Sequence, residues 1–220
     1  MSQNRPLDTF LLTGMARSGT TLLDKLLTNH SALDVLSQPF PYLYRYLKEQ
    51  FFDSIDYPPT YYVLNNLFNE RRYSPATFQA FLQKFTITPQ AVEKQLEAMK
   101  SWSGQGTDIP EAERLLSNYH PGTLKELYAY LLNQLKIGGD VKKVGSKEIL
   151  IEEFIPYFLE AGIPVIQIFR DPRDVYTSLN YGKGPEYVGK HRPALFHLRN
   201  WRKSVAIGMS VRDHPSYFYL

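Results

Sequence analysis

The chain has 220 residues and a formal net charge of +3, with 43% hydrophobic and 21% charged residues and no cysteine. This length suits one α/β domain with a sizeable core, and the lack of cysteine excludes disulfides, thiolate nucleophiles and cysteine-based metal sites. The mild charge, without a basic stripe, fits a small anionic ligand and not a nucleic acid. Because no signal-peptide core and no run of roughly 20 apolar residues is present, we expect a cytoplasmic protein without a membrane span.

A strand, a glycine loop and a helix are predicted in that order over residues 9–27. Residues 10–12 form a short apolar run typical of a buried strand, and residues 14–19 form a tight turn. Four leucines then recur at helical spacing: Leu22, Leu23, Leu26 and Leu27. Backbone N–H groups of such a loop converge with the helix N-terminus on an anion, so this stretch predicts a phosphate-binding loop.

The loop departs from the usual sequence G-x-x-x-x-G-K-[ST] at one position. The spacing from Gly14 to Gly19 fits, but Thr20 stands where the lysine belongs, and Arg17 lies inside the loop instead. The planar guanidinium of Arg17 suits phosphate or sulfate. Three hydroxyls add donors to the backbone cradle: Ser18, Thr20 and Thr21.

The middle of the chain is expected to be largely helical. Residues 32–36 predict a second short strand, which leads into a loop that contains Gln38. The aromatic-rich residues 42–62 predict an amphipathic helix that packs against the core, with an acceptor-binding lid as the alternative. Residues 63–140 predict a helical insertion, with helix starts at Pro89 and Leu124 and no metal or nucleophile pattern.

Strand–helix alternation resumes at residue 141. Residues 141–146 predict a strand leading to Lys147, residues 150–159 a helical stripe that Pro156 kinks or restarts, and residues 163–169 a buried parallel strand. A last helix over about 194–212 and a strand over 216–220 follow. The whole chain therefore predicts a single α/β domain with a doubly wound, mainly parallel sheet and ligands at the carboxyl ends of the strands.

A second anion-binding constellation follows the strand at 163–169. Arg170 ends this strand, and Ser178 lies about two turns into the next helix, so both can reach one ligand. The alternative is a capping network, in which Arg170 and Arg173 pair with Asp171 and Asp174. Two anion sites on one sheet suggest a ligand with phosphates at two places.

These two stretches together resemble the sulfotransferase family, which uses 3′-phosphoadenosine 5′-phosphosulfate (PAPS) as sulfuryl donor. The segment G-M-A-R-S-G-T-T-L-L is similar to the family's 5′-phosphosulfate loop, and R-D-P-R-D-V-Y-T-S to its 3′-phosphate motif. The resemblance implies that Arg17 to Thr21 grip the phosphosulfate and that Arg170 and Ser178 hold the 3′-phosphate, without a metal. It also implies that Lys147 approaches the transferred sulfuryl group, although a solvated lysine at a strand end is the alternative.

Two features depart from the family pattern. Many relatives place a glutamate base after the second strand, but here Gln38 stands nearby, and an amide cannot take a proton. His30 and Asp34 are the nearest titratable groups, followed by Glu148. His30 is our candidate base, with a surface residue that ends the helix as the alternative. Relatives also continue beyond the last strand into a basic loop that closes over the nucleotide, so we expect a truncated product, a natural short form or half of a split protein.

The sequence thus predicts a PAPS-dependent sulfotransferase acting on a hydroxyl or amine of unknown identity, carried by a small molecule, glycan or lipid. A P-loop phosphotransferase such as a nucleotide-dependent kinase is the second hypothesis, disfavoured by Thr20 and by the lack of a metal-binding acid at the end of a neighbouring strand. A catalytically degenerate nucleotide-binding module is the third.

Overall fold

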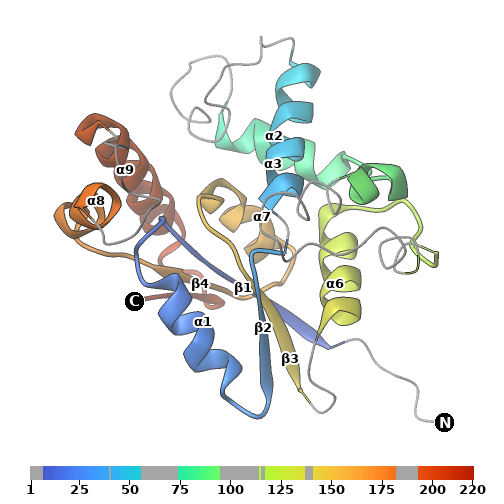
Figure 1. The fold of residues 1–220 in the computed structure, drawn as a ribbon. Helices are drawn as coiled ribbons and strands as arrows, with labels where there is room; N and C mark the ends of the chain where they lie inside the picture. Colours follow the sequence, from blue (N-terminus) through green and yellow to red (C-terminus); the bar gives the residue numbers. More distant parts are fainter. Residues whose placement is uncertain are drawn as a thin grey trace.

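A computed structural model describes residues 7–39, 41–55, 74–94, 114, 117–136, 141–181 and 193–220. Its centre is a five-stranded sheet in the order β2-β3-β1-β4-β5, in which every pair of neighbours is parallel (Figure 1). The strands are β1 (Asp8–Gly14), β2 (Leu33–Ser37), β3 (Lys143–Lys147), β4 (Val165–Ile168) and β5 (Tyr217–Tyr219). This arrangement confirms the predicted α/β class with a doubly wound parallel sheet.

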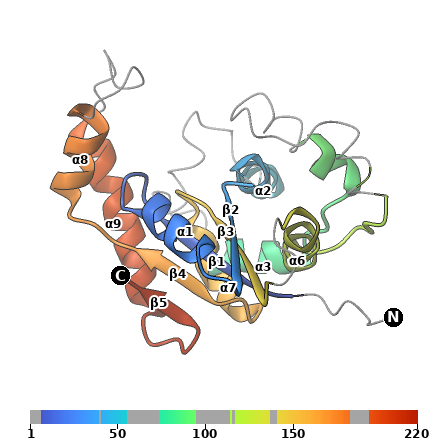
Figure 2. The same cartoon turned by 60° about the horizontal axis from the view of Figure 1, so that its bottom comes forward.

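Helices cover both faces of the sheet (Figures 1 and 2). On one face lies α1 (Thr20–Thr28), which follows the first loop directly. The other face is covered by α6 (Leu124–Leu135), the short η1 (Glu152–Phe154), α7 (Ile155–Glu160) and α9 (Ala194–Val211). Pro156 lies in the first turn of α7, so it starts a second helix and does not kink a longer one.

The alternation of side chains along the strands explains this division. Leu11 and Val144 join the large core cluster beneath α6 and α7. Phe10 points to the opposite face, where a Cβ on Gly145 would lie 2.5 Å from its ring. Since neighbouring residues of a strand point to opposite faces, Lys147 shares the α1 face with Gly145. This orientation places Lys147 beside the helix that follows the loop.

Aromatic side chains fill the core between the sheet and the helices α2 (Pro41–Ser54) and α3 (Pro75–Lys84). Tyr44, Phe51 and Phe52 of α2 are each at most 1% exposed. The core-helix interpretation of the aromatic stretch is therefore confirmed as far as residue 55; its later tyrosines lie outside the described residues. Such rings contribute more buried apolar area than any other side chains.

The predicted insertion over 63–140 is only partly described. Residues 89–94 are helical, as the proline at 89 predicted. However, α6 is not a peripheral addition, because its Tyr128 hydroxyl contacts the Phe10 carbonyl oxygen at 2.7 Å and Ser146 Oγ at 2.9 Å. From Leu124 onward the chain is thus part of the layer that covers the sheet.

A buried ionic cluster joins three elements behind the sheet. Glu153 Oε1 accepts hydrogen bonds from Lys48 Nζ of α2 at 3.0 Å and from Lys203 Nζ of α9 at 2.7 Å. Burial lowers the pKa of Lys48 to about 8, against the opposing effect of Glu153. Burial also opposes ionisation of Glu153, but the two lysines hold its pKa below the ordinary value.

Among the helices of the described ranges, none combines the length and the apolar character that a membrane crossing needs.

Candidate anion-binding site

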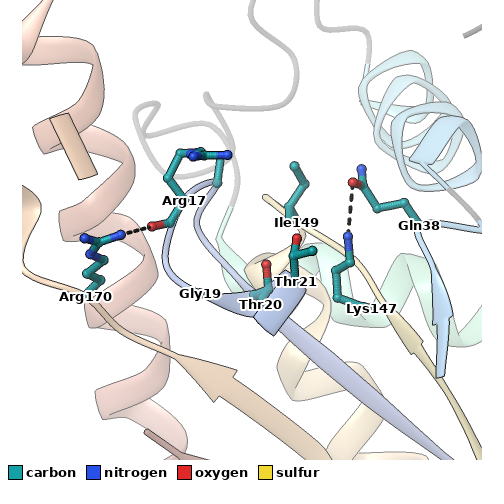
Figure 3. Close-up of a pocket in the computed structure, with 9 residues that line it drawn as sticks. Arg17, Gly19, Thr20, Thr21, Gln38, Lys147, Ile149 and Arg170 are labelled. Carbon is teal, nitrogen blue, oxygen red and sulfur yellow. Dashed lines mark hydrogen bonds between the residues drawn. The ribbon is translucent and has the colours of Figure 1, made fainter. Parts of the chain in front are cut away.

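A cavity of about 320 Å³ opens at the carboxyl ends of β1, β2 and β3, beside Arg170, which lies two residues after the end of β4 (Figure 3). Its walls come from four segments that are far apart in the sequence. The lining residues are Ala16, Arg17, Gly19, Thr20, Thr21, Gln38, Lys147, Ile149 and Arg170. The sheet therefore brings together most of the predicted site residues at the edge where a parallel α/β sheet binds ligands.

The loop between β1 and α1 has the backbone of an anion cradle. A Cβ on Gly14 would lie 2.7 Å from the Ile168 carbonyl oxygen, so only glycine lets the loop approach β4 this closely. Gly19 lines the cavity and has a φ of 109°, and a Cβ at this position would have no atom within 4 Å. No side chain caps α1, and its intrahelical bonds begin at the Leu22 N–H, which donates to the Gly19 carbonyl oxygen at 3.0 Å, so the N–H groups of Gly19, Thr20 and Thr21 precede the first of these bonds. These donors are available to an anion.

Ser18 does not line the cavity, in contrast to the prediction that it grips the ligand. Its side chain is 6% exposed, and its Oγ donates to the Met15 carbonyl oxygen at 2.7 Å. Its backbone N–H bonds to the same oxygen at 3.2 Å. Ser18 therefore stabilises the turn from inside, while Thr20 and Thr21 contribute the hydroxyls that line the cavity.

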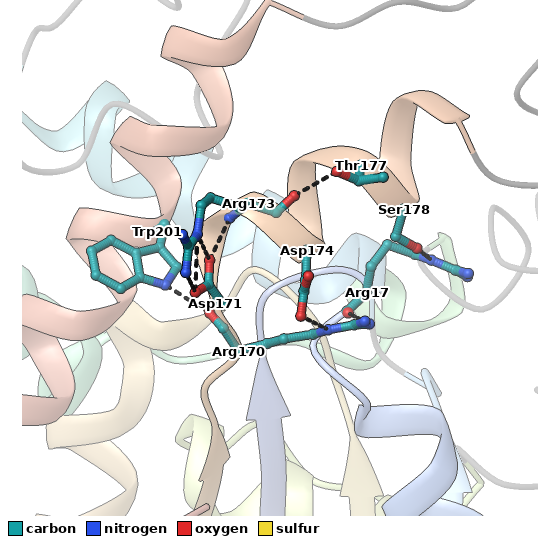
Figure 4. A network of polar contacts seen from close by, with 8 residues as sticks. All are labelled: Arg17, Arg170, Asp171, Arg173, Asp174, Thr177, Ser178 and Trp201. Atoms are coloured by element: carbon teal, nitrogen blue, oxygen red, sulfur yellow. Dashed lines mark hydrogen bonds and ion pairs between the residues drawn. The ribbon is translucent and has the colours of Figure 1, made fainter.

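Arg17 links the loop to the second predicted motif (Figure 4). It adopts a left-handed backbone conformation with a φ of 68°, and it is exposed. Its Nε donates to Ser178 Oγ at 2.9 Å, and Arg170 Nη1 donates to the Arg17 carbonyl oxygen at 3.1 Å. The three residues predicted to hold two anionic groups are thus in direct contact.

Arg170 also takes part in the capping network that was the alternative prediction. α8 (Pro172–Tyr181) begins directly after Asp171, whose Oδ1 accepts the backbone N–H of Arg173 at 2.8 Å. The Arg173 guanidinium bonds to the same carboxylate and holds the pKa of Asp171 at about 2. Arg170 Nε lies 3.7 Å from Asp174, a long and exposed contact that is weak in water. The capping network is therefore confirmed, and because Arg170 also lines the cavity, its binding of an anion stays a prediction.

Lys147 and Gln38 lie next to each other on one wall of the cavity (Figure 3). Lys147 Nζ donates to Gln38 Oε1 at 3.3 Å, and the Gln38 backbone N–H bonds to the Lys147 carbonyl oxygen at 2.7 Å. An ammonium has no acceptor, so this contact assigns the oxygen of Gln38 toward Lys147 and leaves its amide N–H₂ as a donor. Burial lowers the pKa of Lys147, although the carboxylates of Asp24 and Glu148 act in the opposite direction.

The prediction that His30 acts as the base is contradicted by its position. α1 carries the chain away from the loop, and ten residues of helix correspond to roughly 15 Å. His30 follows the far end of α1, where its Nδ1 accepts the Ala32 N–H at 3.2 Å. The Ala32 carbonyl oxygen in turn accepts the N–H of Lys143, at the amino end of β3. His30 therefore lies at the opposite edge of the sheet from the cavity.

The other two candidate bases are also turned away from the cavity. Asp34 is paired in register with Val144, on the face of β2 opposite to Ser37. Glu148 is 1% exposed, and its charge acts on Tyr44 and Tyr128 in the core. No carboxylate or imidazole lines the cavity within the described ranges. The described lining therefore offers cations, hydroxyls and N–H donors, which suits an anion.

Asp24 is a site residue that the sequence analysis missed. Its side chain is 6% exposed and interacts with Ser37 and with the charge of Lys147. Burial raises its pKa above the ordinary value of 3.8. One signal was available in the sequence, since an acid four residues after Thr20 lies on the same helix face.

Comparisons with known proteins do not add to this description: no protein-family model matches the chain, and no curated protein matches it. Within the part of the chain that the structure describes, no group of three or more histidine, aspartate or glutamate side chains is placed to hold a metal ion.

Proposed function

We propose that the protein is a sulfotransferase that moves a sulfuryl group from PAPS to a hydroxyl or amine acceptor. The convergence of Arg17, Arg170 and Ser178 at one edge of the sheet carries this proposal. A donor with a phosphosulfate at one end and a 3′-phosphate at the other needs two cationic sites within a short distance. The loop with Arg17 supplies the first, and Arg170 with Ser178 supplies the second.

The loop residues fit a phosphosulfate group. Gly19 leaves open the space that a side chain would fill, and the uncapped N-terminus of α1 aims N–H groups toward it. When bound, PAPS supplies an activated sulfuryl group whose bond to a phosphate oxygen breaks in the transfer. Arg17 would stabilise negative charge on that oxygen, and Thr20 and Thr21 would hold the phosphate oxygens. Fixed donors of this kind lower a barrier without reorganising during the reaction.

On the opposite wall, Lys147 and Gln38 would bind the sulfuryl oxygens. Lys147 offers an ammonium, and Gln38 offers the amide N–H₂ that its contact with Lys147 leaves outward. Neither residue takes a proton from the acceptor in this arrangement. The group that accepts that proton is therefore not among the described lining residues.

A P-loop phosphotransferase is the second candidate, because the spacing from Gly14 to Gly19 matches the nucleoside-triphosphate loop. Thr20 replaces its lysine, however, and Asp171, the acid nearest to the end of β4, bonds to Arg173. Its carboxylate is thereby directed toward the start of α8 and not toward the loop. A degenerate nucleotide-binding module is the third candidate, which Gln38 favours because it stands near the place of a base.

A thermal-shift experiment separates the donors. At 100 times its dissociation constant, 3′,5′-ADP should raise the midpoint of unfolding by roughly 5–11 °C. We expect this shift in the wild type and a clearly smaller shift in Arg17→Ala. Arg45 pairs with Glu49 on α2, so the control Arg45→Ala should show the same shift as the wild type. A shift with ATP and Mg²⁺ but none with 3′,5′-ADP would support the phosphotransferase instead.

Transfer of labelled sulfate from PAPS to a mixed panel of hydroxyl and amine acceptors tests the activity itself. If the wild type and Arg45→Ala transfer sulfate and Arg17→Ala does not, the hypothesis of a degenerate nucleotide-binding module is excluded. Binding of 3′,5′-ADP without transfer to any acceptor, including water, would favour it.

A further inference from the structure

Asp24 is a buried carboxylate beneath the cavity that the proposed reaction leaves without a role. It lies one helical turn after Thr20, and both side chains face the sheet, with exposed fractions of 6% and 3%. A carboxylate is seldom buried this deeply unless a partner compensates for its lost hydration. The partners of Asp24 therefore indicate what it does.

Two of these partners come from neighbouring strands. Ser37 and Lys147 are paired in register as the last residues of β2 and β3, so their side chains lie next to each other on the α1 face. The Ser37 hydroxyl and the Lys147 ammonium both act to lower the pKa of Asp24, and the Asp24 carboxylate acts to raise the pKa of Lys147.

Lys147 is consequently held from two directions. Gln38 Oε1 accepts from its Nζ at 3.3 Å at the cavity wall, as Figure 3 shows, and Asp24 attracts the same ammonium from beneath. A lysine side chain has a long flexible stem, and ordering it costs conformational entropy. Because Gln38 and Asp24 already order the Lys147 side chain beside the cavity, less conformational entropy is lost when its ammonium binds a ligand.

The charges around Lys147 also determine its protonation. Burial lowers its pKa, and the carboxylate of Asp24 is the strongest opposing influence, ahead of Glu148. Lys25 is the other cation that acts on Asp24. Loss of the Asp24 charge would therefore both loosen the ammonium and make its charged form less favourable.

We propose that Asp24 is a positioning residue that holds Lys147, in its charged form, against the sulfuryl end of the donor. It acts through Lys147 and does not itself touch the ligand. This role rests on the proposed function, because it assigns the transferred group of PAPS to Lys147.

The first test measures the pair without any ligand. The pKa of Lys147 is followed by NMR of ¹³C-labelled lysine side chains, and the signal is assigned with Lys147→Arg. We expect this pKa to fall in Asp24→Asn, to return toward the wild-type value in Asp24→Glu, and to stay unchanged in Asp53→Asn. Asp53 is an exposed acid on α2 and is the matched control. An unchanged Lys147 pKa in Asp24→Asn would overturn the proposal.

The second test compares two ligands by isothermal titration calorimetry. PAPS carries the sulfuryl group and 3′,5′-ADP does not. Asp24→Asn should therefore lower the affinity for PAPS about tenfold or more and change the affinity for 3′,5′-ADP by less than about threefold. Asp24→Glu should recover most of the PAPS affinity, and Asp53→Asn should bind both ligands like the wild type. Equal weakening of both ligands, or of neither, would overturn the proposal.

The two tests separate the possible failures. If the wild type binds neither PAPS nor 3′,5′-ADP, the proposed function fails and the role assigned to Asp24 fails with it, whatever the NMR result. If the wild type binds both ligands and Asp24→Asn retains the Lys147 pKa and the PAPS affinity, the function stands and only the role of Asp24 is overturned.

Discussion

Arg17 Nε and Ser178 Oγ, which belong to residues 161 positions apart, form a hydrogen bond of 2.9 Å. Arg170 Nη1 adds a second link to the same residue through the Arg17 carbonyl oxygen. The loop after β1 and the first two turns of α8 therefore form one continuous surface (Figure 4). A ligand that bridges them meets two arginines and a hydroxyl whose positions are already fixed.

Replacing Ser178 with alanine should reduce the preference for a 3′-phosphate. A hydrogen bond to a charged group contributes about 1.5–3 kcal/mol, so we expect the affinity for 3′,5′-ADP to fall roughly 10- to 100-fold. The affinity for 5′-ADP, which lacks the 3′-phosphate, should change little. Titration calorimetry with both nucleotides measures the ratio of the affinity for 3′,5′-ADP to the affinity for 5′-ADP.

Thr177→Ala is the matched control for Ser178→Ala. Thr177 neighbours Ser178 on α8, but its hydroxyl donates to the Arg173 carbonyl oxygen within the helix at 2.8 Å. This variant should bind both nucleotides like the wild type. Parallel losses of 3′,5′-ADP and 5′-ADP in Ser178→Ala would show that Ser178 supports the loop and does not read the 3′-phosphate.

The parts of the site that could be predicted from the sequence are those carried by local patterns. The loop and its helix follow from glycine spacing and leucine periodicity over residues 9–27, and Arg170 follows from its place after an apolar strand. His30 was misplaced because closeness in sequence ignores the length of α1, which carries it to the opposite edge. Asp24 was missed because Lys147 lies 123 positions away, and the electrostatic interaction between them depends on the strand order β2-β3-β1.

Replacing Gln38 with glutamate should add a base to the cavity. The new carboxylate would lie beside Lys147 Nζ, which now contacts the Gln38 amide oxygen at 3.3 Å. General base catalysis contributes typically 10²–10⁴-fold, so we expect sulfate transfer to hydroxyl acceptors to rise by about tenfold or more. PAPS should bind more weakly, because the added charge repels the donor. Labelled-sulfate transfer to the acceptor panel measures both effects.

The control for Gln38→Glu is Gln50→Glu, which adds the same charge on α2 outside the cavity lining. It should leave transfer unchanged. If Gln38→Glu transfers sulfate no faster than the wild type at saturating PAPS, a carboxylate at this position does not act as the general base, and the prediction is wrong.

Replacing Glu153 with glutamine should destabilise the fold more than any change at the cavity. Glu153 accepts from Lys48 and Lys203, and the side chains of Lys48 and Glu153 are 0% exposed. Removing one partner of a buried ion pair leaves uncompensated charge and costs about 3–5 kcal/mol. Urea unfolding at neutral pH measures this loss. Glu49→Gln, which removes an exposed pair with Arg45, should cost no more than about 1 kcal/mol; a similarly small loss in Glu153→Gln would contradict the prediction.

Replacing Asp24 with asparagine should stabilise the protein while impairing the site. Burial raises the pKa of Asp24 in the folded state above its ordinary value of 3.8, against the opposing effects of the Ser37 hydroxyl and of the charges of Lys147 and Lys25. The folded state therefore binds the Asp24 proton more tightly than the unfolded state, and the free energy of unfolding decreases as pH rises from 3.8 through the folded-state pKa. At neutral pH this cost is fully present, and asparagine removes it.

Urea unfolding over a range of pH tests the predicted direction of this pH dependence of the free energy of unfolding. We expect Asp24→Asn to exceed the wild type in free energy of unfolding at neutral pH, and the difference to shrink below about pH 3.8, where Asp24 is protonated in both states. Asp53→Asn should show no such difference, because Asp53 is exposed. A variant that is less stable than the wild type at neutral pH would mean that Asp24 is retained for stability. Greater stability together with weaker PAPS binding is the combination expected of a residue kept for its effect on Lys147, because functional groups are often held at a cost to the fold.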